Sequence, residues 1–257
     1  MIKVIIAGFR GAMGQQALQM IKEQDNLEVV AVYSPSANAE NAQAAGVEAD
    51  TQVFNQLEDI KVEADVWLDF TTPAAVFENT KFAIEHGYQP VIGTTGLTDQ
   101  QEEELMNLAS DKKVGGLIVP NFSLSAVLLM KFSEEAAQYF SDVEVIEMHH
   151  EDKKDAPSGT ALMTAKRIDK VRKAHEQGDS KETMPGVRGA DLNGIRIHAV
   201  RLPGYVAHEQ VLFGGEGEAL TIRQDSFNRS SFMKGVKLAI EKVHTVDKLT
   251  IGLEQVM

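Results

Sequence analysis

The stretch VIIAGFRGAMG, residues 4–14, decides the fold of the first half of the chain. A short apolar run ends at Gly8, and Gly11 and Gly14 follow where a run with helical spacing begins. Glycine at such a strand-to-helix turn makes the turn tight and lets backbone N–H groups approach a pyrophosphate, and the helix N-terminus adds partial positive charge. The spacing departs from the G-x-G-x-x-G fingerprint, because Arg10 occupies the position of the second glycine. The pattern favours a dinucleotide site over a glycine turn that binds nothing.

Strands and helices alternate through the rest of the first half. Thr72 and Pro73 suit the start of one helix, and Thr98 and Gln101 have capping-box spacing before another. Alternation with short links predicts an α/β fold, a Rossmann-like doubly wound parallel sheet with helices on both faces. The predicted strands are residues 3–8, 27–33, 65–70, 90–96 and 115–123, and the predicted helices are residues 13–24, 71–87, 97–109 and 125–140.

The second half has a different organisation, which predicts an α+β domain with a mixed or antiparallel sheet. Residues 142–150 alternate as a strand with one buried face, and a helix is expected from Ser158 to Ala174. The polar, glycine-rich residues 176–194 predict a mobile loop. Strand-like runs without helices between them, typical of antiparallel strands, then cover residues 195–202, 205–214 and 218–225, and the last helix covers residues 230–243.

These patterns predict two domains. We expect a dinucleotide-binding domain over residues 1–120, rejoined by residues 230–257, and a second domain over residues 121–229.

Composition excludes several classes of partner. The net charge is −13, from 25 Lys and Arg against 38 Asp and Glu, and such a surface repels nucleic acid and anionic lipid. The chain has no cysteine, so disulfides and thiolate metal sites are excluded. The N-terminal apolar run breaks at Gly8, too early for a signal peptide, and no apolar stretch approaches the roughly 18 residues of a membrane helix. We therefore expect a soluble cytoplasmic protein.

The end of the second predicted strand bears on the choice between NADH and NADPH. The usual fingerprint has an acidic residue there to bind the ribose 2′-hydroxyl, but here Ser34 lies at the tip and no carboxylate follows until Glu40. Serine hydroxyls together with Arg10 suit a 2′-phosphate better. NADPH is the favoured cofactor, with use of both open, and a solvated Arg10 is the alternative interpretation.

Three further strand ends offer small or hydroxyl residues over which a nicotinamide ribose could lie. They are DFTTP (residues 69–73), GTTG (residues 93–96) and PNFS (residues 120–123). Ligand sites of open α/β sheets lie at such carboxyl ends. Helix capping, for example by Thr72, is the alternative role of these residues.

A cationic segment, HHEDKKDAPSGT at residues 149–160, stands out in this acidic chain. On a regular strand His149 and His150 point to opposite faces, and Lys153 follows. Ser158 is a natural N-cap, so the next N–H groups start a helix and, with the lysine and a histidine, form a site for a carboxylate. Histidine is also a suitable general acid near neutral pH. The alternative is an exposed charged turn; a metal site is not expected, because the two histidines diverge.

Five segments of the chain resemble segments of a known family. GFRGAMG, GTTG, PNFS, EMHHEDKKDAPSGTAL and IRQDSFNRSSFMKGV, in this order and spacing, are similar to the 4-hydroxy-tetrahydrodipicolinate reductases, also called dihydrodipicolinate reductases, of lysine and diaminopimelate biosynthesis. The resemblance covers nearly the whole chain. It implies hydride transfer from NAD(P)H to a small cyclic dicarboxylate with loss of water, giving tetrahydrodipicolinate. It also implies a homotetramer built through the strands of residues 195–223.

The resemblance also implies roles for individual residues. His149 matches the proton donor and Lys153 its helper, and His150, Lys153, Gly159 and Thr160 match residues that hold the substrate carboxylates. The implied dinucleotide contacts, with Ser34 added from the strand-end argument, are Gly8, Phe9, Arg10, Gly11, Ala12, Met13, Ser34, Gly93, Thr94, Thr95, Val119, Pro120, Asn121, Phe122 and Arg229. The family's acidic residue after the second strand is replaced here near Ser34.

Two rival functions stay open from the sequence. One is a nucleotide-binding regulator that has lost turnover, although His149, Lys153, Gly159 and Thr160 are all present. The other is an amino-acid dehydrogenase of related two-domain build, which would not require the His-His-Lys segment.

Overall fold

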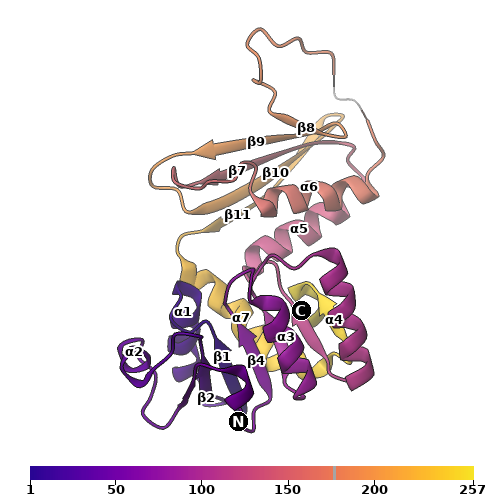
Figure 1. The fold of residues 1–257 in the computed structure, drawn as a ribbon. Helices are drawn as coiled ribbons and strands as arrows, with labels where there is room; N and C mark the ends of the chain where they lie inside the picture. Colours follow the sequence, from indigo (N-terminus) through magenta and orange to yellow (C-terminus); the bar gives the residue numbers. More distant parts are fainter. Residues whose placement is uncertain (176–177) are drawn as a thin grey trace. The chain divides into compact units, whose positions relative to one another are not determined.

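The glycine turn follows the first strand of a seven-stranded sheet in the computed structural model, which describes residues 1–175 and 178–257 (Figure 1). The chain forms two compact units, residues 1–122 with 232–257 and residues 123–231. Our sequence expectation put the joins at 120/121 and 229/230. The last helix belongs to the first unit, so the chain leaves this unit once and returns to it.

The sheet of the first unit is parallel throughout, in the order β12-β6-β5-β4-β1-β2-β3. This arrangement confirms the predicted doubly wound sheet. The strands are β1 (Ile2–Ala7), β2 (Leu27–Tyr33), β3 (Gln52–Phe54), β4 (Val66–Asp69), β5 (Gln89–Ile92), β6 (Gly116–Ile118) and β12 (Leu249–Ile251), and the helices are α1 (Ala12–Lys22), α2 (Ala39–Ala44), α3 (Val76–Glu85), α4 (Asp99–Lys112) and α7 (Met233–Lys242).

Alternate residues of these strands are buried on opposite faces, as the two-residue period requires. Ile5, Trp67 and Ile92 form one apolar cluster with residues of α3 and α4, which pack on each other. Ile6 and Leu68 are equally buried but belong to the other face, and α1 packs on α7. Burial on both faces explains why the strands read as nearly continuous apolar runs.

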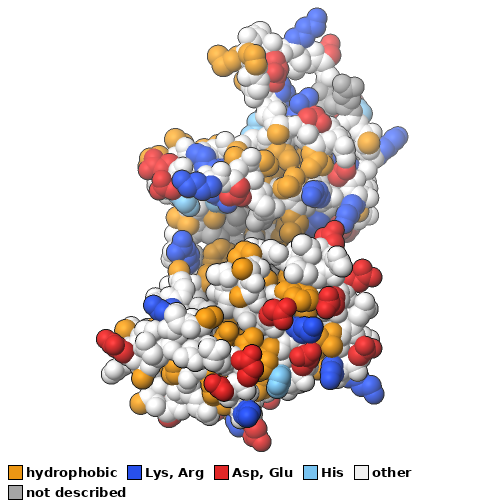
Figure 2. All heavy atoms as spheres, in the orientation of Figure 1, with side chains coloured by type: hydrophobic (Ala, Val, Ile, Leu, Met, Phe, Trp, Pro, Cys, Tyr) orange, Lys and Arg blue, Asp and Glu red, His pale blue; other side chains and the backbone are white. Residues whose placement is uncertain are grey.

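Acidic side chains are scattered over the face of the first unit that Figure 2 shows. Figure 2 shows them spread over α3 and α4, and α4 alone contributes Asp99, Glu102, Glu103, Glu104 and Asp111. The negative charge of the chain therefore lies partly on the outer side of these helices.

The second unit has a five-stranded mixed sheet in the order β11-β10-β7-β9-β8. Its strands are β7 (Asp142–His149), β8 (Ala190–Leu192), β9 (Ile195–Arg201), β10 (Ala207–Gly215) and β11 (Glu218–Ser226), and its helices are α5 (Leu124–Ala136) and α6 (Gly159–Val171). Strands β7 and β9 are parallel, and the other neighbours are antiparallel. Both helices pack on one face of this sheet (Figure 1).

The expected loop over residues 176–194 needs a correction. Ala190–Leu192 is a strand, β8, antiparallel to β9, and residues 176–177 lie outside the described residues. In the described part of the loop, the Glu182 carboxylate accepts hydrogen bonds from the backbone N–H groups of Gly186 and Arg188, each at 2.9 Å. Among the described residues, no helix has the length and apolar character needed to cross a bilayer.

Candidate active site

Two of the three glycines of the first turn are required by close backbone contacts. Gly8 has φ of +79°, and a Cβ atom there would lie 2.3 Å from the Phe70 carbonyl oxygen. A Cβ atom on Gly14 would lie 2.4 Å from the Gly8 carbonyl oxygen. Gly11 is less confined, since its Cβ would be 3.4 Å from the nearest atom. The turn therefore packs against the end of β4 and against its own helix, as a dinucleotide turn requires.

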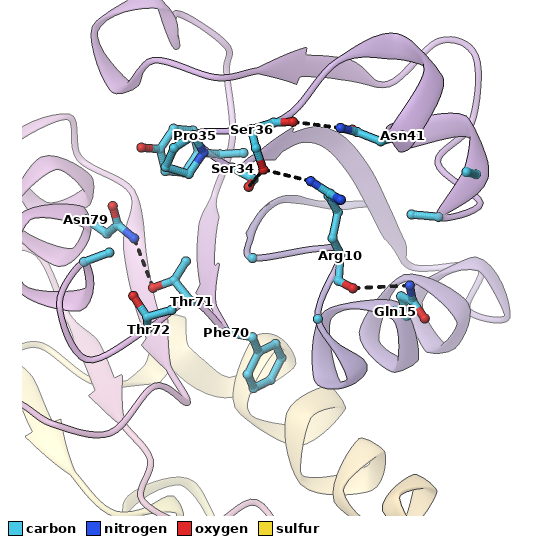
Figure 3. Close-up of a pocket in the computed structure, with 16 residues that line it drawn as sticks. Arg10, Gln15, Ser34, Pro35, Ser36, Asn41, Phe70, Thr71, Thr72 and Asn79 are labelled. Carbon is cyan, nitrogen blue, oxygen red and sulfur yellow. Dashed lines mark hydrogen bonds between the residues drawn. The ribbon is translucent and has the colours of Figure 1, made fainter.

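A cavity of about 620 Å³ opens beside this turn, at the carboxyl ends of β1, β2 and β4 (Figure 3). Arg10 is the one charged side chain among the sixteen residues that Figure 3 draws around it. The lining consists of Gly8, Arg10, Gly11, Gln15, Tyr33, Ser34, Pro35, Ser36, Asn41, Ala44, Ala45, Phe70, Thr71, Thr72, Ala75 and Asn79. The sequence-predicted residues Gly8, Arg10, Gly11 and Ser34 thus surround one cavity.

Arg10 is held at the end of β2 by hydrogen bonds. Its Nη1 donates to Ser36 Oγ at 2.8 Å, and Ser34 Oγ lies 3.5 Å from the same hydroxyl (Figure 3). Asn41 Nδ2 donates to the Ser36 carbonyl oxygen at 2.7 Å. The sequence prediction omitted Ser36 and Asn41, although Ser36 follows Ser34 by two residues. A cation and two hydroxyl groups, without a carboxylate in the lining, form the end of the cavity nearest β2.

Asp69, at the end of β4, connects several of the predicted strand ends. This fully buried carboxylate accepts hydrogen bonds from Thr71 Oγ1 at 2.6 Å, from Thr94 Oγ1 at 2.7 Å and from Asn79 Nδ2 at 3.0 Å. Trp67 Nε1 donates to it as well, at 3.2 Å. Asp69 therefore holds together the segments that follow β4 and β5.

The other predicted cofactor contacts of the first unit lie in three environments. Thr94, Thr95, Val119 and Pro120 line a smaller cavity of about 190 Å³. A Cβ atom on Gly93 would meet the rings of Phe70 and Phe122, which pack edge to face with centroids 5.7 Å apart. The Phe9 side chain is fully buried in the core, so only its backbone faces the turn. Ala12 and Met13 begin α1, Asn121 follows β6, and Arg229 is an exposed residue of the second unit.

The second unit gathers the predicted acid–base residues between the end of β7 and the start of α6. His149 is the last residue of β7, and its half-buried ring places Nδ1 2.5 Å from Glu147 Oε2. His150 lies just beyond the strand and is exposed. The two histidines therefore have different environments, as the strand geometry predicts.

Glu147 is fully buried and accepts hydrogen bonds at both oxygens. Arg201 Nη1 and Nη2 donate to Oε2 and Oε1, each at 2.8 Å, and the Ser158 backbone N–H donates to Oε1 at 3.0 Å. Burial raises the pKa of Glu147, but the hydrogen bonds from His149, Arg201 and Ser158 outweigh it and lower this pKa to about 2. Glu147 is a carboxylate at neutral pH.

The sequence prediction missed Glu147 and Arg201 as site residues. The spacing of Glu147 and His149, two residues apart on one strand, could have placed them on one face. Arg201 could not be identified from residue spacing, because it lies on a different strand. The parallel pairing of β7 with β9 brings it next to His149.

Lys153 and the start of α6 complete the segment. Lys153 Nζ donates to Asp155 Oδ1 at 2.6 Å, and this hydrogen bond is the main cause that lowers the pKa of Asp155. Ser158 caps α6, its hydroxyl accepting from the Ala161 N–H at 3.2 Å. Gly159 is exposed and a Cβ atom there would meet no atom within 4 Å, and its backbone interacts with the Asp155 carboxylate, so an anionic group already lies at this end of α6.

The fold and these residues together define a class. A doubly wound parallel sheet with a glycine turn and a cavity at its strand ends is the nucleotide-binding unit of an NAD(P)-dependent oxidoreductase, and the second unit supplies a histidine paired with a carboxylate. Comparison with known proteins then identifies the family. Residues 2–122 match the family described as "Dihydrodipicolinate reductase, N-terminus", and residues 125–257 match "Dihydrodipicolinate reductase, C-terminus". The chain belongs to the dihydrodipicolinate reductase family, which confirms the resemblance seen in the sequence.

Individual relatives match over their full length. The chain is 61% identical over 259 residues to the 4-hydroxy-tetrahydrodipicolinate reductase of Limosilactobacillus fermentum and 57% identical over 261 residues to that of Lactiplantibacillus plantarum, with 100% of each chain covered. Among solved structures, the dipicolinate-bound dihydrodipicolinate reductase from Paenisporosarcina sp. TG-14 has a TM-score of 0.92 and 47% identity, again over 100% of both chains. The C-terminal family match includes α7 and β12, which fold with the first unit.

Proposed function

We propose that this protein reduces 4-hydroxy-tetrahydrodipicolinate to tetrahydrodipicolinate with NAD(P)H, releasing water, in lysine and diaminopimelate biosynthesis. The observation that carries the proposal is the His149 imidazole, held against the buried carboxylate of Glu147, which also accepts a hydrogen bond from the N-cap of α6. Full-length similarity to reductases of this name supports the substrate, and the cavity at the strand ends supports the cofactor. Residues 1–120 with 230–257 would bind the dinucleotide, and residues 121–229 the substrate.

The cofactor, when bound, supplies the hydride. His149 supplies the proton from Nε2, because its Nδ1 is already engaged with Glu147. The substrate carboxylates would be bound by His150, Lys153 and the N–H groups of Gly159 and Thr160 at the start of α6. Lys153 would exchange the exposed carboxylate of Asp155 for a carboxylate of the substrate. A dianionic substrate explains why an acidic chain has its cationic groups in this segment.

We further propose that NADPH is preferred and that NADH is also used. Arg10, Ser34 and Ser36 lie where the ribose 2′-substituent of a bound dinucleotide is expected, and they suit a phosphate. The carboxylate that would bind a free 2′-hydroxyl is not among the residues lining the cavity. Gly93 to Thr95, Val119 to Phe122 and Arg229 are proposed as further cofactor contacts.

A homotetramer is part of the proposal. The sheet face of the second unit that α5 and α6 leave uncovered includes the half-buried side chains of Ile146, Val200 and Leu212. Strands β9 to β11 would pair these faces between subunits. A cytoplasmic location is also proposed, because the pool of reduced dinucleotide is there.

The test is oxidation of NADPH, and separately of NADH, by the purified protein. Substrate would be generated in the cuvette from pyruvate and aspartate semialdehyde by the preceding pathway enzyme. Loss of the cofactor signal only when every component is present is expected. Binding of a cofactor without turnover would instead support the nucleotide-binding regulator, and turnover with amino or keto acids the amino-acid dehydrogenase.

A further inference from the structure

A buried ionic cluster lies behind His149, on the side of the ring that faces the protein. Its centre is Glu147, which is 0% exposed. Two further strands contribute, with Arg201 on β9 and Glu209 on β10, and Ser158 joins from the start of α6. None of these four residues is among those proposed above to bind the substrate or the cofactor.

Each contact of Glu147 restricts the orientation of its carboxylate. Arg201 binds both oxygens in a bidentate pair, which fixes the plane of the group, and the Ser158 N–H fixes which edge faces α6. The remaining position on Oε2 faces His149 Nδ1 at 2.5 Å. Since a carboxylate only accepts hydrogen bonds, His149 Nδ1 must be the donor and must keep its proton.

We propose that Glu147 is a positioning residue for proton transfer: it holds the ring of His149 with Nδ1 protonated, so that Nε2 alone exchanges the proton used in the reaction. This inference rests on the proposed role of His149 as proton donor. The neutral ring left after donation from Nε2 is the Nδ1–H tautomer, which the carboxylate stabilises. Arg201 and Ser158 affect His149 only indirectly, because their hydrogen bonds hold the Glu147 carboxylate in place.

Glu209 offers a matched control within the same cluster. It pairs with Glu147 across β7 and β10, on the same face of the sheet, and is 1% exposed. Its Oε1 has no hydrogen-bond partner within the described part of the chain. Burial, with a smaller contribution from the charge of Glu147, raises the pKa of Glu209 to about 7, against a hydrogen bond from Thr164. One glutamate is thus ionised and hydrogen-bonded to His149, whereas its neighbour has a raised pKa and no contact with the ring.

The test combines the tautomer of His149 with the kinetics of two variants. Long-range ¹H–¹⁵N spectra of ¹⁵N-histidine-labelled protein, assigned with a His149→Gln sample and recorded at a pH where the ring is neutral, should show the Nδ1–H tautomer. Glu147→Gln should shift the ring toward the Nε2–H form and lower kcat by about 10²-fold or more, with the KM for substrate within about three-fold of wild type. Glu147→Asp, which keeps a carboxylate, should retain the tautomer and part of the activity. Glu209→Gln should leave both unchanged.

Several results would overturn the inference. A wild-type spectrum in which the His149 ring is mainly the Nε2–H tautomer would do so even if neither glutamate variant folds. So would a Glu147→Gln enzyme with normal kcat alongside an impaired His149→Gln enzyme, a result that leaves the proposed function intact. Equal losses in Glu147→Gln and Glu209→Gln would show a general effect of packing. Failure of the proposed function has a different signature, because the wild-type protein itself would then have no turnover.

Discussion

At the residue scale, three of the cationic or titratable groups proposed for the chemistry lie next to a side-chain or hydroxyl partner that orients them. His149 contacts Glu147, Lys153 contacts Asp155, and Arg10 contacts Ser36. The first partner is buried, whereas Asp155 and Ser36 are exposed. A buried partner orients a group permanently, and an exposed partner can be exchanged for a ligand at small cost.

The exchangeable pair of Lys153 leads to a prediction on substrate binding. Lys153→Ala should raise the KM for substrate and lower kcat, each by about ten-fold or more, because a hydrogen bond to a charged group is worth about 1.5–3 kcal/mol. Lys154→Ala, the neighbouring exposed lysine, is the control and should change neither value by more than about two-fold. Steady-state kinetics with both variants would check this. Unchanged kinetics for Lys153→Ala would remove this residue from the site.

Arg10 leads to a prediction on cofactor choice. Arg10→Ala should raise the KM for NADPH by about 10- to 100-fold, because a charge-assisted pair with a 2′-phosphate is lost. The KM for NADH, measured on the same preparation, should stay within about three-fold of wild type, since NADH has no 2′-phosphate. Equal effects on the two cofactors would contradict the assignment of the 2′-phosphate to Arg10.

At the scale of elements, the backbone contacts of the glycine turn distinguish two glycines that look alike in the sequence. Gly14→Ala places a methyl group 2.4 Å from the Gly8 carbonyl oxygen, whereas Gly11→Ala meets its nearest atom at 3.4 Å. Overpacking against backbone should outweigh the gain of about 1 kcal/mol in helix propensity for Gly14→Ala. Thermal unfolding should show Tm lower by about 6 °C or more for Gly14→Ala, and by about 3 °C at most for Gly11→Ala. Equal values of Tm would show that the turn is looser than described.

The elements also show how far the sequence determines this structure. Five strands of the parallel sheet, the helices α1, α3, α4 and α7 and the N-cap at Ser158 were predicted, because apolar period and capping residues are local signals. The short elements β3, β12 and α2 were not predicted. Strand β8 was missed, since Ala190–Leu192 is short, polar and surrounded by glycines. The insertion of β7 between β9 and β10 was also missed, because pairing between distant strands has no local signature. Arg201 could not be placed beside His149 for the same reason.

At the scale of the whole molecule, the two buried glutamates make opposite contributions to the pH dependence of stability. Glu147, with its pKa lowered to about 2, contributes stability above its ordinary pKa, and this is lost as pH falls toward 2. Glu209, with its pKa raised to about 7, contributes stability below its ordinary pKa, and this is lost as pH rises through about 7. Of these two effects, only the second acts around neutral pH.

Glu209→Gln should therefore flatten the pH profile of unfolding. The Tm of the wild type should fall relative to that of Glu209→Gln between about pH 5 and pH 8, because Glu209 loses its proton at a lower pH in the unfolded chain than in the folded protein. Thermal unfolding of both proteins in the same buffers cancels the common effect of the net charge of −13. Parallel profiles would mean that Glu209 is ionised in the folded protein at all these pH values.

We propose that this chain is a reductase whose proton donor is His149, and a single comparison of kcat tests both parts of this proposal. The value of kcat for NADPH oxidation would be compared between wild type and His149→Gln with freshly generated substrate, together with the Kd for NADPH. We expect turnover by the wild type and a kcat lower by about 10²–10⁴-fold in the variant, with an unchanged Kd for NADPH. An unchanged kcat in His149→Gln would contradict it.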